Sequence, residues 1–197
     1  MEFFSISILL LSFLILLSIG TPIAWSIIIS ALFTLLVSVP FLPALTTVSQ
    51  RMATGLDSFA LLAIPFFILA GELMNRGGVA QRLVSFAKAL VGFLPGGLAL
   101  INIISAMLMG SVAGSAMASA SAMGSILGPE MEKEGYSKGF GVAVNITSAT
   151  TGLVIPPSNI LIVYSLASGG ASIAALFLAG YVPGIITGLF LMIVAMI

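Results

Sequence analysis

A tandem proline interrupts one of the apolar stretches of this chain, in the segment GLVIPPSNILIVY at residues 152–164. Because proline has no amide hydrogen, Pro156 and Pro157 cannot donate to the carbonyls of Gly152 and Leu153, as a continuous helix would require. A carbonyl left unpaired in hydrocarbon costs several kcal/mol, so protein, water or an ion must satisfy it. The segment therefore predicts a broken helix whose unpaired carbonyls are satisfied by protein, water or an ion.

Neutral oxygen atoms surround this break. They come from the hydroxyl and amide side chains of Thr147, Thr150, Thr151, Ser158 and Asn159. Alkali and other hard cations take oxygen ligands, and secondary transporters use unwound backbone carbonyls to coordinate Na⁺. The alternative is a tolerated proline kink, which fits the isolated Pro65 and Pro183 better than it fits two adjacent prolines. The break therefore predicts a sodium site.

A second polar cluster lies in the apolar stretch at 98–128. Of the 16 residues at 110–125, 13 are Gly, Ala or Ser, with Ser111, Ser115 and Ser119 at intervals of four. Small residues at this spacing are also typical of tight helix packing in membranes, and packing is the favoured reading for Ser119 and Ser121 taken singly. If the stretch turns back at its middle, its tip should lie against the break and share one ion. The predicted sodium ligands are Ser111, Gly114 and Ser115 at the tip and Gly152, Ile155, Pro156, Pro157 and Ser158 at the break.

Composition places these clusters in a membrane protein. Hydrophobic residues make up 60% of the 197 residues and charged residues only 6%, against about a quarter in soluble domains. The absence of His and Cys excludes the usual zinc, thiol and imidazole chemistry, and one Asp cannot form an aspartyl dyad. We therefore expect no enzyme and no organic cofactor. No basic tract points to nucleic acid, and no charged ring points to a channel filter.

The apolar stretches predict an all-α polytopic membrane protein. Residues 44–58 suit a short interfacial segment, and residues 79–97 suit an amphipathic interfacial helix or, less well, a further span. Residues 98–128 could cross once or form a re-entrant hairpin, and residues 139–166 form the broken span. Unbroken spans are expected at 3–19, 23–39, 59–75 and 172–197.

The positive charges favour the re-entrant hairpin. If 98–128 returns to the side it came from, five of the six basic residues share one face and only Arg51 lies on the other. A full crossing would instead divide the basic residues three and three. The positive-inside rule then makes the richer face cytoplasmic and the N-terminus periplasmic.

Three motifs in order resemble the large membrane subunit of tripartite ATP-independent periplasmic (TRAP) transporters. They are AIPFFILAGELMNRGG at 63–78, GSVAGSAMASASAMGSILGPEMEKEGYSK at 110–138 and TGLVIPPSNILIVY at 151–164, within a similarity that runs from about Gly20 to the end. Members of that family are longer and contain two inverted repeats. We therefore expect a partial chain that holds the first repeat.

The resemblance implies a sodium-driven importer of small organic acids in the bacterial inner membrane. Its partners would be membrane lipid, a small membrane subunit and a periplasmic substrate-binding protein, and its transport domain would move as an elevator. On this chain, residues 1–58 and 167–197 would be scaffold, residues 59–97 a span and linking helix, and residues 98–166 part of the transport domain. A non-transporting structural subunit and a sodium/carboxylate symporter that needs no binding protein are the alternatives.

The resemblance also suggests where substrate binds. The family's hairpin usually carries an Asp where this chain has Ser119, so no carboxylate is expected there. Asn159 after the prolines is more similar to the sugar-acid branch, such as sialic acid transporters, than to the C4-dicarboxylate branch. The predicted substrate-binding residues are Ser119, Thr150, Thr151 and Asn159.

Overall fold

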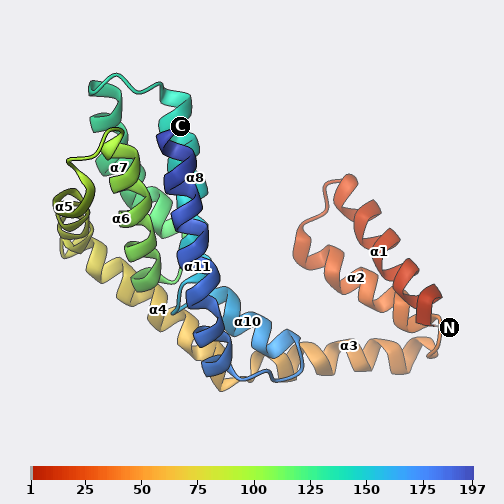
Figure 1. The fold of residues 1–197 in the computed structure, drawn as a ribbon. Coiled ribbons are helices and arrows are strands. Elements are labelled where there is room, and N and C mark those ends of the chain that lie inside the picture. The colour runs from red at the N-terminus through yellow and green to blue at the C-terminus, as the bar shows by residue number, and fades with distance from the viewer. Residues whose placement is uncertain (1) are drawn as a thin grey trace. The chain divides into compact units, whose positions relative to one another are not determined.

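The structure, a computed structural model, describes residues 2–197, and all regular secondary structure in that range is helical (Figure 1). The prediction of an all-α chain is therefore confirmed over the described residues. The helices form two compact units, Met1–Ser58 and Phe59–Ile197. Each unit is described by itself below.

The first unit contains α1 (Glu2–Ser18), α2 (Ile23–Leu36) and α3 (Phe41–Leu56). α1 and α2 pack against each other across a turn at Gly20, whose φ of 86° suits glycine. Just after this turn the Thr21 and Ser26 hydroxyls lie 3.1 Å apart, and Ser26 is buried. The short interfacial segment expected at 44–58 belongs to α3, a helix that begins three residues earlier.

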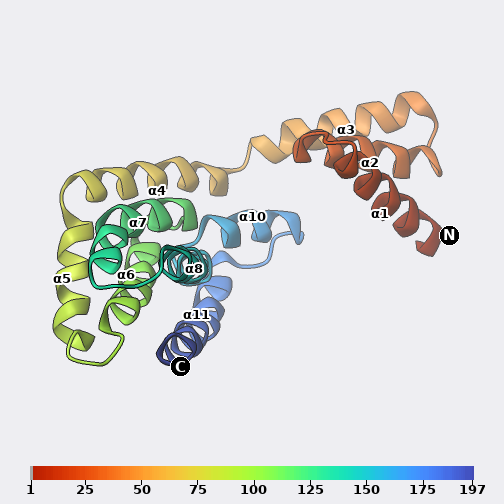
Figure 2. The ribbon, with the colours of Figure 1, turned by 90° about the horizontal axis from the view of Figure 1, so that it is seen from above.

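The second unit carries both predicted polar clusters. Its helices are α4 (Phe59–Arg76), α5 (Val79–Val91), α6 (Gly97–Ala113), α7 (Ala116–Lys133), α8 (Lys138–Ala149), α9 (Thr151–Val154), α10 (Asn159–Ala167) and α11 (Ile173–Met196). α6 lies at the centre, and α4, α5, α7, α8, α9 and α11 all pack against it (Figure 2).

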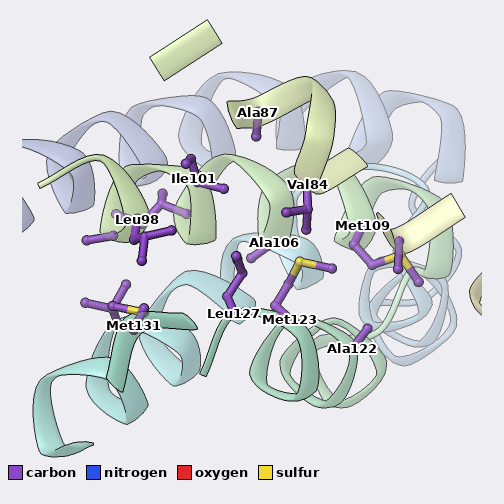
Figure 3. Close-up of a cluster of buried hydrophobic side chains, with 14 of the residues drawn as sticks. Val84, Ala87, Leu98, Ile101, Ala106, Met109, Ala122, Met123, Leu127 and Met131 are labelled. Carbon is purple, nitrogen blue, oxygen red and sulfur yellow. The ribbon is translucent and has the colours of Figure 1, made fainter. Parts of the chain in front are cut away.

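The core of this unit is built around α6 and α7. Figure 3 shows Leu98, Ile101 and Met109 of α6 near Met123 and Leu127 of α7, all buried among aliphatic side chains. Met109 and Met123 are unbranched and flexible, so together with the aliphatic side chains they fill the space between two helices that carry many small residues. The core therefore holds the hairpin helices in a fixed register, which positions the tip.

The amphipathic helix expected at 79–97 is α5, which ends at Val91. Ala80, Val84 and Ala87 are buried against the core, whereas Phe86 and Leu90 are about half exposed. Small residues at this spacing allow α5 to approach α6 closely, and the larger apolar side chains point away.

Within the described residues, α11 is the one helix that by itself is long and apolar enough to cross a membrane. Two successive pairs, α3 with α4 and α8–α9 with α10, reach this length if each pair counts as one span, which gives up to three candidates. The spans expected at 3–19 and 23–39 are helices of 17 and 14 residues. At 1.5 Å per residue, α2 covers about 21 Å of a hydrocarbon layer that is about 30 Å thick.

Candidate ion-binding site

The hairpin turns at Gly114 and Ser115. Gly114 ends α6 in the left-handed conformation, with φ 60°, and donates its N–H to the Gly110 carbonyl at 2.8 Å. Ser115 is extended and begins α7, and its hydroxyl accepts the Ala118 N–H at 3.4 Å. The turn joins α6 to α7, and these two helices pack against each other. The helical hairpin expected at 98–128 therefore has its tip at the predicted residues.

The broken helix separates at the prolines. α9 ends at Val154, Ile155 is extended, the Pro156–Pro157 peptide is cis, and Ser158 begins α10 by accepting the Leu161 N–H at 3.3 Å. The two halves are bent by 51°. The prolines thus produce the break that the sequence predicted.

One carbonyl at the break has a hydrogen-bond donor that the sequence did not suggest. The Ser158 hydroxyl donates to the Leu153 carbonyl, so this carbonyl is paired rather than open. The Gly152 carbonyl lacks its helical donor, because the residue four positions later is Pro156, which has no N–H. The prediction of two open carbonyls was therefore wrong at Leu153.

The hairpin tip touches the break. The Asn159 N–H donates to the Gly114 carbonyl at 3.4 Å. A Cβ added to Gly114 would stand 3.0 Å from the Pro157 carbonyl oxygen and 3.5 Å from Asn159 Oδ1. Asn159 Oδ1 is buried and has no hydrogen-bond partner among the described residues. The junction therefore brings backbone oxygens and an unpaired amide oxygen beside a residue that has no side chain.

A second close approach lies one turn before the tip. The backbones of Gly110 in α6 and Gly152 in α9 are in contact, and a Cβ on Gly152 would stand 2.6 Å from the Gly110 Cα. No real Cβ comes this close to a backbone atom, so both positions require glycine. This pair fixes the register in which α6 of the hairpin packs against α9 of the broken helix.

The other predicted site residues use their hydroxyl protons on backbone carbonyls. Ser111 donates to Leu108 at 2.7 Å and Thr150 to Thr147 at 2.6 Å, both within a helix. The buried hydroxyls show the same behaviour: Thr151 donates to Ser148 at 2.6 Å, and Ser119 donates across the hairpin to Ala106 at 3.0 Å. The packing role considered for Ser119 is therefore visible. The binding roles of Ser111, Ser115, Ser119, Thr150 and Thr151 stay predictions.

α11 contributes a glycine face that packs on the break. A Cβ on Gly180 would overlap the Val154 carbonyl oxygen, and one on Gly184 would overlap the Ile155 side chain. Gly180, Gly184 and Gly188 are buried and recur every four residues, which is a sequence signal for close helix contact. The sequence reading placed 172–197 in the scaffold and did not connect it with the break. Whether α11 moves with the hairpin stays a prediction.

A buried polar contact between α6 and α8 was also missed. Asn102 Oδ1 accepts the Ser148 hydroxyl at 3.1 Å, and Asn145 Nδ2 donates to the Ala120 carbonyl at 2.8 Å. Asn102 and Ser148 are 1% and 0% exposed. A single Asn inside LALINIISAMLMG was the available signal, because a buried amide in an apolar helix must find partners.

Comparisons with known proteins identify the family of this chain. The family described as "Tripartite ATP-independent periplasmic transporter, DctM component" matches residues 10–197. An uncharacterized Salmonella typhimurium protein, YgiK, is 57% identical over 98% of this chain and 44% of its own length.

Several relatives carry substrate names. The isethionate TRAP transporter permease DctMQ of Oleidesulfovibrio alaskensis is 42% identical over 91% of this chain and 28% of its own length. The sialic acid TRAP transporter permease SiaT of Haemophilus influenzae is 38% identical over 95% of this chain and 30% of its own length. The chain thus spans less than half the length of these relatives. It belongs to the DctM family of TRAP transporter large permeases, a family of membrane transport proteins rather than enzymes.

Proposed function

We propose that this chain is part of the permease of a sodium-coupled importer of small organic acids, with a sodium ion at the junction of hairpin tip and break. The observation that carries the proposal is the buried, unpaired Asn159 Oδ1 beside Gly114 and the Pro157 carbonyl. A buried acceptor without a partner costs about 1–3 kcal/mol, so the site favours a ligand that supplies positive charge.

Helix ends add to the preference for a cation. α6 ends at Ala113, and the α8–α9 segment ends at Val154, so the carbonyl ends of two helices meet here. Each helix end carries a partial negative charge, equivalent to about half an elementary charge before screening. The proposed ligands are oxygens of 111–115 and 152–158, to which the structure adds Asn159 Oδ1. The sequence assigned Asn159 to the substrate; we assign its amide oxygen to the ion because it faces Gly114.

The same junction offers a complementary place for an anion. α7 begins at Ala116 and α10 at Asn159, so two helix N-termini start beside the proposed sodium site. Their caps occupy the Ala118 and Leu161 N–H groups, and the Asn159 N–H already donates to Gly114. Such N-termini favour carboxylates. Sodium would order the break, and the ordered break would form one wall of the substrate site, with Ser119, Thr150 and Thr151 as the further candidate substrate residues.

The relatives support the substrate class and the partners. Their printed names include isethionate, sialic acid, C4-dicarboxylates and 2,3-diketo-L-gulonate, which are all organic anions. We propose a sugar acid, such as sialic acid, as the substrate of this chain. The words "tripartite" and "periplasmic" in the family description support a small membrane subunit and a periplasmic binding protein as partners. We also propose the bacterial inner membrane as the location, with the periplasmic N-terminus that the positive-inside rule predicts.

The test is uptake of a radiolabelled sugar acid by cells that express the complete transporter, in sodium medium and in choline medium. We expect uptake to require sodium. The variant Asn159→Leu should raise the sodium concentration for half-maximal uptake several-fold, because it removes a ligand oxygen. The control Ser125→Ala changes an exposed residue that bonds within its own helix, and it should leave this concentration unchanged.

Two results would contradict the proposal. Equal uptake in sodium and choline would show that transport is not coupled to sodium. An unchanged sodium dependence in Asn159→Leu would show that sodium does not bind at the junction. If the cells take up a dicarboxylate or a sulfonate instead of a sugar acid, the ion site stands and the substrate assignment fails.

A further inference from the structure

A small cavity lies between α6, α7 and α8, at the opposite end of the hairpin from its tip. It measures about 70 Å³, and its wall includes Asn102, Asn145, Gly128 and Met131 together with two exposed charged residues, Glu132 in the last turn of α7 and Lys138 at the start of α8. Asn102 precedes Gly114 by 12 residues along α6, which at 1.5 Å per residue places it about 18 Å from the tip. The cavity is therefore distinct from the proposed sodium site.

Two buried polar atoms of the wall residues lack hydrogen-bond partners among the described residues. They are the donor Asn102 Nδ2 and the acceptor Asn145 Oδ1. The other half of each amide is engaged, because Asn102 Oδ1 accepts from Ser148 and Asn145 Nδ2 donates to the Ala120 carbonyl. A reversed Asn145 amide would bring two oxygens together, so the side chain is held as it stands.

The pairing requirements of these two atoms define the ligand. A cation could bind Asn145 Oδ1 but would be repelled by the Asn102 N–H group, and an anion would meet the reverse problem. Water accepts one hydrogen bond and donates another, so it satisfies both atoms. One water needs roughly 10–15 Å³ on this volume scale, so the cavity has room for a small cluster.

We propose that this cavity is a water-binding site, filled from the charged segment 130–138 where α7 passes into α8. The bound water bridges Asn102 and Asn145. Among the described residues, one side-chain hydrogen bond links α6 and α8, from the Ser148 hydroxyl to Asn102. The proposed water lies beside this bond. The contact between α8, which leads into the break, and α6 of the hairpin therefore contains water.

Radiolytic hydroxyl-radical labelling tests the proposal, because radicals form from water and oxidise the methionines that water reaches. Met131 lines the cavity, whereas Met123 lies in the dry core of the same helix, and the two are 1% and 0% exposed (Figure 3). In the purified protein in lipid nanodiscs, we expect Met131 to be oxidised several-fold faster than Met123. Equal rates would overturn the proposal, whatever any variant does.

A cavity-filling variant separates bound water from opening of the nearby loop. Gly128 lines the cavity and has open space where a Cβ would stand, so Gly128→Val places its side chain in the volume assigned to water. We expect the oxidation rate of Met131 to fall to that of Met123 in this variant. If Met131 is oxidised as fast as in the wild type, water reaches it by loop opening and the cavity is not the source.

Discussion

The contact between Gly110 and Gly152 gives the sharpest mutational prediction. In Gly110→Ala, the new methyl group would overlap the Gly152 Cα and stand 3.1 Å from its nitrogen and 3.2 Å from its carbonyl carbon. All three are backbone atoms, so no side chain can rotate away. Carbon atoms in contact normally lie about 3.5–4.0 Å apart, so α6 and α9 must move apart.

The cost follows from overpacking and is isolated by a matched control. Forcing an extra methyl group into a packed contact costs about 1–3 kcal/mol. Replacing Gly by Ala inside a helix also stabilises by up to about 1 kcal/mol, which partly hides the loss. Gly139→Ala, in α8, has a similar propensity gain and nothing within 4 Å of the added Cβ. The difference between the two variants should therefore be the steric cost alone, about 1–3 kcal/mol in unfolding free energy.

Thermal unfolding of the purified protein in detergent measures this difference. We expect Gly139→Ala to unfold at or slightly above the wild-type midpoint and Gly110→Ala clearly below it. Because Gly110 lies one turn before Gly114, the displaced hairpin should also need more sodium for any given stabilisation. Equal midpoints for the two variants would refute the backbone contact and with it the register of hairpin and break.

Two further predictions concern packing around the same elements. In Gly180→Ala, the added methyl meets the rigid Val154 carbonyl, so we expect a loss of about 1–3 kcal/mol; Gly188→Ala meets the flexible Met107 side chain and should cost less. Thermal midpoints compare the two, and equal losses would contradict this reading of α11. Ser119→Ala removes the hydroxyl bond across the hairpin and should cost about 1 kcal/mol in denaturant unfolding. An unchanged stability would show that this bond contributes nothing.

Local chemistry explains why the tip and the break could be predicted from the sequence. Adjacent prolines remove amide donors wherever they stand, so Pro156 and Pro157 end a helix without reference to any other element. Gly114 followed by Ser115 combines a residue that tolerates positive φ with a preferred helix N-cap. Both features depend on neighbours in sequence, and both lie where they were predicted.

Contacts between distant residues were harder to predict. Asn102 and Ser148 are 46 residues apart, and their hydrogen bond depends on the register in which α6 meets α8. The exposed Phe86 and Leu90 of α5, and the glycine face of α11 against Val154, depend on packing in the same way. The meeting of tip and break was predicted because a shared ion requires it, and the Asn159–Gly114 hydrogen bond confirms that the two segments touch.

Sodium-dependent thermal stability of Gly114→Ala tests the proposed ion site most directly. Gly114 and Gly135 both have positive φ, so an alanine at either position carries strain of about 1–2 kcal/mol. Only at Gly114 does the new Cβ meet the junction, 3.0 Å from the Pro157 oxygen, whereas at Gly135 it meets nothing within 4 Å. Gly135→Ala therefore controls for backbone strain.

The measurement is the shift in unfolding midpoint when sodium replaces choline at constant ionic strength. A ligand at a hundred times its dissociation constant stabilises the folded state by about 2.7 kcal/mol, which gives a readily measured shift. We predict that wild type and Gly135→Ala gain this stabilisation and that Gly114→Ala loses most of it. Equal sodium shifts in all three proteins, or no shift in the wild type, would contradict a sodium ion between the hairpin tip and the broken helix.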